Sequence, residues 1–464
     1  MIEVLTTLDK SEVREFKKWL QSPIHNQRED VVQLFDYLMA GNHLYEDKFL
    51  EKERVYRKIF GKEPYNDAKL RQTVHFLFKS LEEYLYFKQY IQNDLHTRIS
   101  LVESYRARGL EKMVKKNLDQ VHRQLDEAEF RNEIYYRTNY EHQKEKYNHL
   151  SSQPKNAKIN LQEVSDALDK TFIIEKLQWS CRGYFHQNLF RTQYDLGLLD
   201  AVLDKVEKNH MTEDPAIAIY YYVLKAITDE KDDQAYFEKL RSEINEYSRL
   251  FPHSQLREIY LMAINYCVRK MNAGVEGFAK ETFEWYRLGI SDEVLIDRGT
   301  LSPITFNNTV ATAIKAGEFE WAEHFIDEWN AMLPESEREN LSHFSRAKLF
   351  FEKKDYRRAM ILLVQAEYNN ILFNINAKSM LLKMYYEEGE MDALESLLDS
   401  FRIYIRRKEV LGYHRNRYLG LIKFTKKLLR VSPFEKEKVQ KLREEIQNSN
   451  HPERQWLLER LDDM

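Results

Sequence analysis

A tight turn recurs in the second half of the chain and constrains the fold more than any other feature of the sequence. A turn residue followed a few positions later by an alanine occurs in AGEFEWA (316–322, Gly317 and Ala322), KKDYRRA (353–359, Asp355 and Ala359) and EGEMDAL (388–394, Gly389 and Ala393). The alanines are 37 and 34 residues apart. Such a period predicts two-helix units, each of which needs its neighbours to bury its apolar face.

Weaker versions of the same turn occur upstream, in ARGLEKM (107–113), DLGLLDA (195–201) and ITDEKDDQA (227–235). In the clearest unit we expect Gly317 to form the turn between the paired helices, because glycine adopts backbone conformations that other residues avoid. Ala322 is expected to be small because the second helix packs closely on the first. The sequence therefore predicts an array of helix pairs over residues 96–430.

Composition supports a fold made mostly of helices. The 464 residues include only 13 Gly and 9 Pro, about 5% of the chain against a usual share of about 12%. Sheets joined by tight turns need these residues more often. Hydrophobic residues make up 43% of the chain, which is ample for a packed core. We predict an all-α fold, an α-solenoid of degenerate helix pairs with a small helical N-terminal domain.

Charge and cysteine content exclude several classes of protein. The 71 basic and 75 acidic residues give a net charge of -4, so nothing attracts the whole chain to nucleic acid or to an anionic membrane. Cys181 and Cys267 are the only cysteines, which excludes a disulfide framework and suits a reducing compartment. The longest apolar run, residues 216–224, is half as long as a bilayer span. We expect a cytoplasmic protein with no membrane partner.

Three regions follow from the pattern along the chain. Residues 1–95 predict a helical N-terminal domain, in which Asp9 and Glu12 have the spacing of a capping box. Residues 96–430 contain the helix pairs. Residues 431–464 predict amphipathic helices that cap the end of the array.

The clearest unit, SPITFNNTVATAIKAGEFEWAEHFIDEWNAMLPE, resembles the tetratricopeptide repeat, with some similarity to the pentatricopeptide repeat. The resemblance rests on the turn, on Ala322 and on Pro334 twelve residues later. The next two units keep the alanine and an apolar residue, Leu363 or Leu397, but lack the proline. All three lack the tryptophan and the leucine-glycine pair of that family's first helix. The resemblance implies an interaction scaffold; the N-terminal stretches WLQSP and YRKIFG resemble helical proteins of Bacteroidetes, which implies no activity.

Motifs for catalysis, phosphate binding and metal binding are missing from the sequence. It contains no H-E-x-x-H, G-x-S-x-G, G-x-x-x-x-G-K-[ST] or G-x-G-x-x-G. His142, Glu145 and His149 share one helix face. The two histidines are about 10 Å apart along a helix, too far to bind one metal ion together, so we expect a solvated surface there. Cys181, beside Arg182, is expected to be a packed helix residue. The sequence predicts no enzyme activity, no metal and no cofactor.

The segment 401–430 is the sharpest local feature, with ten basic side chains and one acid, Glu409. Tyrosines interleave with the basic residues, a combination that binds single-stranded nucleic acid elsewhere. The expected partner-binding residues are Arg402, Arg406, Arg407, Tyr413, Arg415, Arg417, Tyr418 and Lys423.

Acidic neighbours offer an alternative, because they are placed to neutralise this basic segment. They occur before it, in YEEGEMDALESLLD, and after it, at Glu435, Glu437, Glu444 and Glu445. We therefore favour a scaffold or adaptor that binds another protein or a peptide on the solenoid surface. A nucleic-acid-binding protein that uses residues 402–430 is the alternative.

Overall fold

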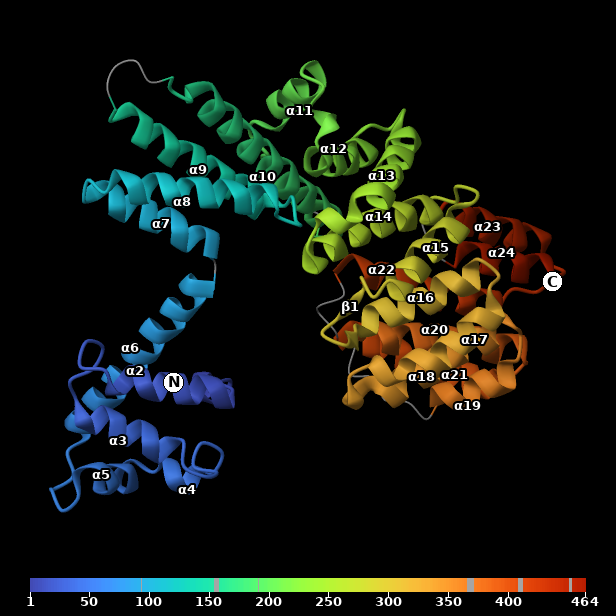
Figure 1. Cartoon of the computed structure of the whole chain (residues 1–464). Coiled ribbons are helices and arrows are strands. Elements are labelled where there is room, and N and C mark those ends of the chain that lie inside the picture. Colours follow the sequence, from blue (N-terminus) through green and yellow to red (C-terminus); the bar gives the residue numbers. More distant parts are fainter. Residues whose placement is uncertain (93, 154–157, 191, 365–370, 408–411, 450–452) are drawn as a thin grey trace. The chain divides into compact units, whose positions relative to one another are not determined.

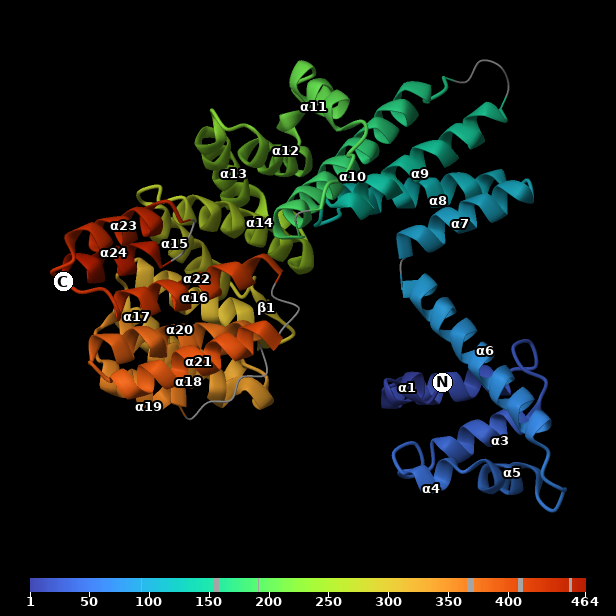
Figure 2. The same cartoon turned by 180° about the vertical axis from the view of Figure 1, so that it is seen from behind.

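The structure, a computed structural model, describes residues 1–92, 94–153, 158–190, 192–364, 371–407, 412–449 and 453–464. Those residues form 24 α-helices, three short 3-10 helices and one hairpin of two-residue strands. The protein is therefore all-α, as its low Gly and Pro content predicts. It has two compact units, Met1–Lys176 and Leu177–Met464. Figures 1 and 2 show the helices of the chain from opposite sides. The finer domain limits at residues 95 and 430 stay predictions.

The first unit contains nine complete helices and the start of a tenth. They are α1 (Ile2–Thr6), α2 (Lys10–Gln21), α3 (Glu29–Leu38), α4 (Asp47–Leu50), α5 (Lys52–Phe60), α6 (Asp67–Gln92), α7 (Asp94–Ala107), α8 (Glu111–Asp126), α9 (Glu133–Ser151) and α10 (Leu161–Phe190).

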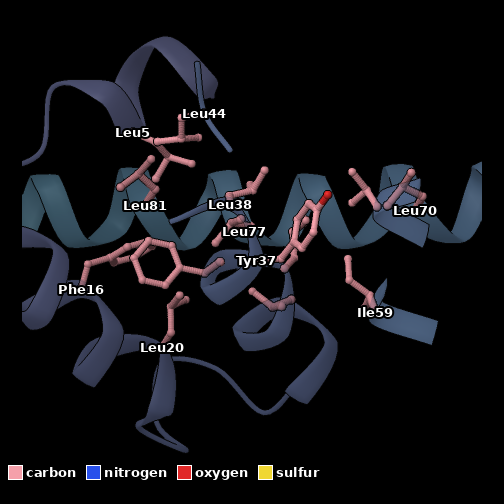
Figure 3. Packing of buried hydrophobic residues seen from close by; sticks show 14 of the residues in the cluster. Leu5, Phe16, Leu20, Tyr37, Leu38, Leu44, Ile59, Leu70, Leu77 and Leu81 are labelled. Carbon is pink, nitrogen blue, oxygen red and sulfur yellow. The ribbon is translucent and has the colours of Figure 1, made fainter. Parts of the chain in front are cut away.

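Helix α6 is the centre of the core that α1–α5 build. Figure 3 shows this core with Leu77 and Leu81 of α6 among side chains from the preceding helices. Phe16 of α2 is fully buried there and meets the ring of Phe35 edge-on, with the ring centroids 5.0 Å apart. Burial of such apolar side chains favours folding of this region.

The predicted capping box at the start of α2 is confirmed. One carboxylate oxygen of Asp9 accepts hydrogen bonds from the amides of Ser11 and Glu12, at 2.6 and 2.8 Å. The Glu12 carboxylate accepts in return from the Asp9 amide at 3.0 Å. The two backbone donors hold the pKa of Asp9 below its ordinary value. Both ends of the motif thus satisfy amides that the first helical turn leaves without partners.

The second unit begins within α10, at Leu177. Its helices are α11 (Leu199–Lys208), α12 (Pro215–Thr228), α13 (Asp233–Tyr247), α14 (His253–Asn272), α15 (Phe278–Ser291), α16 (Pro303–Lys315), α17 (Phe319–Trp329), α18 (Glu335–Glu352), α19 (Tyr356–Val364), α20 (Ile371–Glu387), α21 (Met391–Arg407), α22 (Gly412–Leu428), α23 (Lys436–Gln447) and α24 (Arg454–Asp462). The 3-10 helices are η1 (Met211–Glu213), η2 (Ser248–Leu250) and η3 (Asn330–Met332).

Helices of the second unit pack mainly on their sequence neighbours. Helices α12 and α13, α14 and α15, α16 and α17, α18 and α19, and α20 and α21 form contacting pairs. The first helices of successive pairs also touch, α12 with α14, α16 with α18, and α18 with α20. Figure 1 shows these helices following one another in chain order. This pattern is a solenoid-like arrangement, in which each pair completes its core with the next.

The repeat turns end the first helix of a pair in one common way. A left-handed residue stands two positions before the next helix in three places: Gly317 before Phe319, Lys354 before Tyr356, and Gly389 before Met391. In the first of them the Glu318 amide donates to the Ala313 carbonyl five residues back, at 2.9 Å. This is a Schellman motif, which pairs the last carbonyls of a helix.

The structure corrects the predicted repeat pattern at two positions. In the second turn the left-handed residue is Lys354, with φ of 59°, whereas the sequence interpretation chose Asp355. In the third unit the residue in the place of the buried Ala322 is Leu394, which is fully buried, whereas Ala393 is only half-buried. The helix pairs therefore align when they are counted from the left-handed residue of each turn. The position of the small side chain does not align them.

Two of the three upstream turns share a left-handed glycine two residues before a helix. Gly109 precedes α8 by two residues and Gly197 precedes α11 by two, both with positive φ. The segment 227–235 differs, because it contains no left-handed residue.

A short hairpin interrupts the helices between α15 and α16. Strand β1 (Ile296–Asp297) pairs antiparallel with β2 (Thr300–Leu301). Its two turn residues, Arg298 and Gly299, both have positive φ. Positive φ at both central residues is characteristic of the two-residue type I′ hairpin turn.

Candidate partner-binding surface

Helix α21 presents two different halves to solvent. Its buried stripe consists of Leu394, Leu398, Phe401 and Ile405, spaced at three and four residues as one helix face requires. The outward side is acidic in the first half of the helix and basic in the second. The exposed charged residues are Asp392, Glu395, Asp399, Arg402, Arg406 and Arg407.

The three arginines at the end of α21 are exposed, as the sequence interpretation requires of partner-binding residues. Arg402 approaches Asp399 at 3.9 Å, a distance at which an exposed ion pair contributes little. Within the described residues Arg406 and Arg407 form no ion pair. Both stand in the last helical turn, where the helix dipole favours positive charge.

Helix α22 shows how far acidic neighbours neutralise the basic segment. Lys426 binds Asp399 at 2.7 Å, and Lys427 binds Glu445 of α23. These lysines hold the pKa of Asp399 and of Glu445 below their ordinary values. Neutralisation is therefore local: it reaches the two lysines on α22 and leaves the arginines at the end of α21 exposed.

Arg415 and Lys423, also predicted to meet a partner, have different surroundings. Arg415 is half-buried, and its guanidinium donates to the backbone carbonyl of Arg406, which ties the start of α22 to the end of α21. Lys423 is exposed, with its ammonium 5.5 Å from the ring centre of Phe424. The side chains of Tyr413 and Arg417 lie outside the described part of the structure.

Tyr404 and Tyr418, the tyrosines of this segment whose side chains the structure describes, pack against the helix stack. Tyr418 is half-buried, packs on the core that α20–α24 share, and donates its hydroxyl to Asn376 of α20 at 3.2 Å. Tyr404 packs on the same core, with the Lys378 ammonium 5.7 Å from its ring centre. Burial raises the pKa of Tyr404. Partial burial of both rings leaves less of each face on which an unpaired base could stack.

The polar face of α9 contradicts the sequence interpretation. His142, Glu145 and His149 were expected to be solvated, but all three are buried. The Glu145 carboxylate accepts hydrogen bonds from Arg106 Nε of α7 at 3.1 Å and from Asn148 at 2.8 Å. These bonds keep a buried charge supplied with partners.

His142 is the most strongly perturbed group of this face. Its Nε2 lies 3.2 Å from the Leu118 carbonyl, to which it donates, while no hydrogen bond to Nδ1 occurs among the described residues. Burial lowers the pKa of His142 to about 4, so the ring is neutral at pH 7. No group of three or more His, Cys, Asp or Glu in the described parts of the chain could hold a metal ion.

Two further residues with reactive or metal-binding side chains, Cys181 and Glu207, contact other parts of the fold. Cys181 is fully buried, as expected for a packed residue, and burial raises the pKa of its thiol. Glu207, which with His210 forms an E-x-x-H pair at the end of α11, accepts from the Tyr221 hydroxyl at 2.8 Å. Its second neighbour is Lys225, at 3.4 Å.

Sequence reasoning missed a hollow beside the hairpin. A cavity of about 280 Å³ is lined by residues of α14, of the hairpin and of the start of α16. Arg257 and Asp297 form an ion pair of 2.8 Å at its wall, and Ser302 caps α16 there. The only signal in the sequence is the close spacing of Gly299 and Pro303, which is typical of a loop but does not indicate its neighbour on α14.

The chain matches no family model, no curated protein and no solved structure. In the part of the chain that the structure describes, no helix has both the length and the apolar character needed to cross a membrane.

Proposed function

We propose that this chain is a non-catalytic scaffold or adaptor that binds a segment of another protein at the C-terminal end of α21. The observation that carries the proposal is the exposure of Arg402, Arg406 and Arg407 next to the core that α20–α24 share. Arginine pairs with carboxylates through two parallel hydrogen bonds, so the expected partner segment is acidic. The degenerate helix pairs belong, in this proposal, to the tetratricopeptide-like superfamily, which the shared turn geometry supports.

The alternative, a nucleic-acid-binding surface over residues 402–430, has less support. Lys426 and Lys427 already have carboxylate partners, and Tyr404 and Tyr418 pack inside the helix stack. Phosphate affinity depends on unpaired cations, and affinity for single strands depends on stacking platforms.

A charge-reversal pair tests the proposal. The triple variant Arg402→Glu, Arg406→Glu and Arg407→Glu is compared with wild type in affinity capture from native lysate. The matched control reverses three exposed lysines of α8: Lys112→Glu, Lys115→Glu and Lys116→Glu.

We expect a defined protein to be captured by wild type and by the control variant, and lost with the arginine variant. Capture that survives the arginine reversal would overturn the proposal. Retention of wild type on a single-stranded DNA column, with a steep loss as salt rises, would favour the alternative.

A further inference from the structure

A cavity of about 460 Å³ lies along one face of α18, apart from the arginines at the end of α21. Its size is within the range of sites for small molecules. Asn330 of η3 and Leu362 of α19 line it. The other lining residues belong to α18 and recur after three or four positions, as one helix face requires: Glu335, Arg338, Glu339, Ser342, His343 and Arg346.

Two buried donors in the lining of this cavity have no partner. Ser342 is 8% exposed, and its Oγ meets no hydrogen-bond partner within the described ranges. The same is true of the buried Nε of Arg338, one helical turn earlier. Buried polar atoms of folded proteins nearly always have a partner. A guanidinium N–H can only donate and a hydroxyl can donate, so an acceptor oxygen would satisfy both atoms.

The two arginines of the cavity are held by other elements. The Arg338 guanidinium donates through Nη2 to the Ala331 carbonyl of η3, at 2.8 Å. Arg346 pairs with Asp327 of α17. These contacts turn both cations toward the flanking elements and fix the Arg338 side chain in place.

The two carboxylates of the cavity consequently lack a cation of their own. Glu335 and Glu339 are exposed, so they form the rim, whereas the buried Ser342 belongs to the floor. Neither glutamate forms an ion pair in the part of the chain that the structure describes. The cavity therefore combines negative charge at its rim with unpaired donors at its floor.

From this combination we infer that the cavity binds a free α-amino acid. The carboxylate of the ligand accepts hydrogen bonds from Ser342 Oγ and Arg338 Nε, and its ammonium group faces Glu335 and Glu339. Residues 339 and 342 are about 4.5 Å apart along a helix, a separation that two charged groups joined through one carbon can bridge. A lone anion would meet the like charge of the rim, and a lone cation would leave the buried donors unpaired.

Calorimetric titration of the full chain tests the ligand class. The probes are each common L-amino acid, with propionate and ethylamine as molecules that carry a single charge. We expect at least one amino acid to bind, and propionate and ethylamine to bind about tenfold more weakly or not at all. If no amino acid binds up to about 10 mM, water alone fills the cavity and the inference fails. Propionate that binds as tightly as the best amino acid would also overturn it.

Two variants locate the binding in this cavity. Ser342→Ala removes the hydroxyl and Glu339→Gln removes a rim charge, and each should weaken amino-acid binding about tenfold. The controls Ser336→Ala and Glu337→Gln change the same residue types on α18 outside the cavity lining and should bind as wild type does.

Stability separates a ligand contact from a structural one at Ser342. Because its hydroxyl has no partner in the fold, Ser342→Ala should leave the Tm of the unliganded protein unchanged or raise it. Undiminished amino-acid binding by this variant, or a fall in its Tm, would contradict the inference.

Discussion

Helices α9 and α21 carry similar kinds of charged side chains but use them in opposite ways. In α9 the polar residues point into the protein, where Glu145 meets Arg106 and His142 meets a backbone carbonyl. In α21 the buried stripe is wholly apolar and the charges face outward. The difference shows that a run of charges predicts an exposed helix face only where a separate apolar stripe already marks the buried face.

Removal of Arg106 should give the largest effect, because it leaves the buried Glu145 carboxylate without its charged partner. We expect Arg106→Ala to lower the free energy of unfolding by about 3 kcal/mol. Urea unfolding measures the change, and Glu145→Gln, which removes the charge instead, should cost less. A loss below about 1 kcal/mol would mean that the face of α9 is solvated after all.

The buried His142 predicts a dependence of stability on pH. Its pKa falls from 6.5 to about 4 on folding, so between those values the unfolded state binds more protons. Stability therefore falls as the pH drops from about 6.5 toward 4, by at most about 3 kcal/mol from this group. Thermal melts of wild type and His142→Leu across this range should show a steeper loss for wild type. Parallel curves would contradict burial of the neutral ring, with His122, Lys146 and Asp119 as the nearby charges.

Two repeat turns offer a matched exchange in the second unit. Lys354 adopts a left-handed backbone that costs a residue with a side chain about 1 kcal/mol, so Lys354→Gly should stabilise the protein by about that amount. Gly317→Ala, at a similar φ, should destabilise it by about 1 kcal/mol. Chemical denaturation measures both. Equal signs for the two changes would show that the turns are not equivalent.

The smallest effect on stability is expected at the end of α21. Arg406→Ala and Arg407→Ala together should change the free energy of unfolding by no more than about 0.5 kcal/mol, because both side chains are exposed. The same denaturation experiment checks this. A larger loss would mean that these arginines support the fold, in the way that Arg106 does, and do not serve a partner.

Particular elements show how much the sequence could predict. The Asp9 and Glu12 capping box and the turn at Gly317 depend on neighbours within a few residues, so their patterns predicted them correctly. The left-handed Lys354 was missed because lysine carries no signal for that conformation; the surrounding helices impose it. The exposure of the arginines at the end of α21 agreed with expectation, whereas the inward use of Tyr404 and Tyr418 depends on contacts with α20 that no local pattern contains.

The sequence by itself determined that the chain is all-α and where several helices begin and end, because capping, turn formation and the spacing of apolar residues act over a few residues. The tertiary structure alone decided which polar faces are buried. The free energy of a buried charge depends on partners that lie far along the chain, as Arg106 does from Glu145, and those partners come together only when the helices pack.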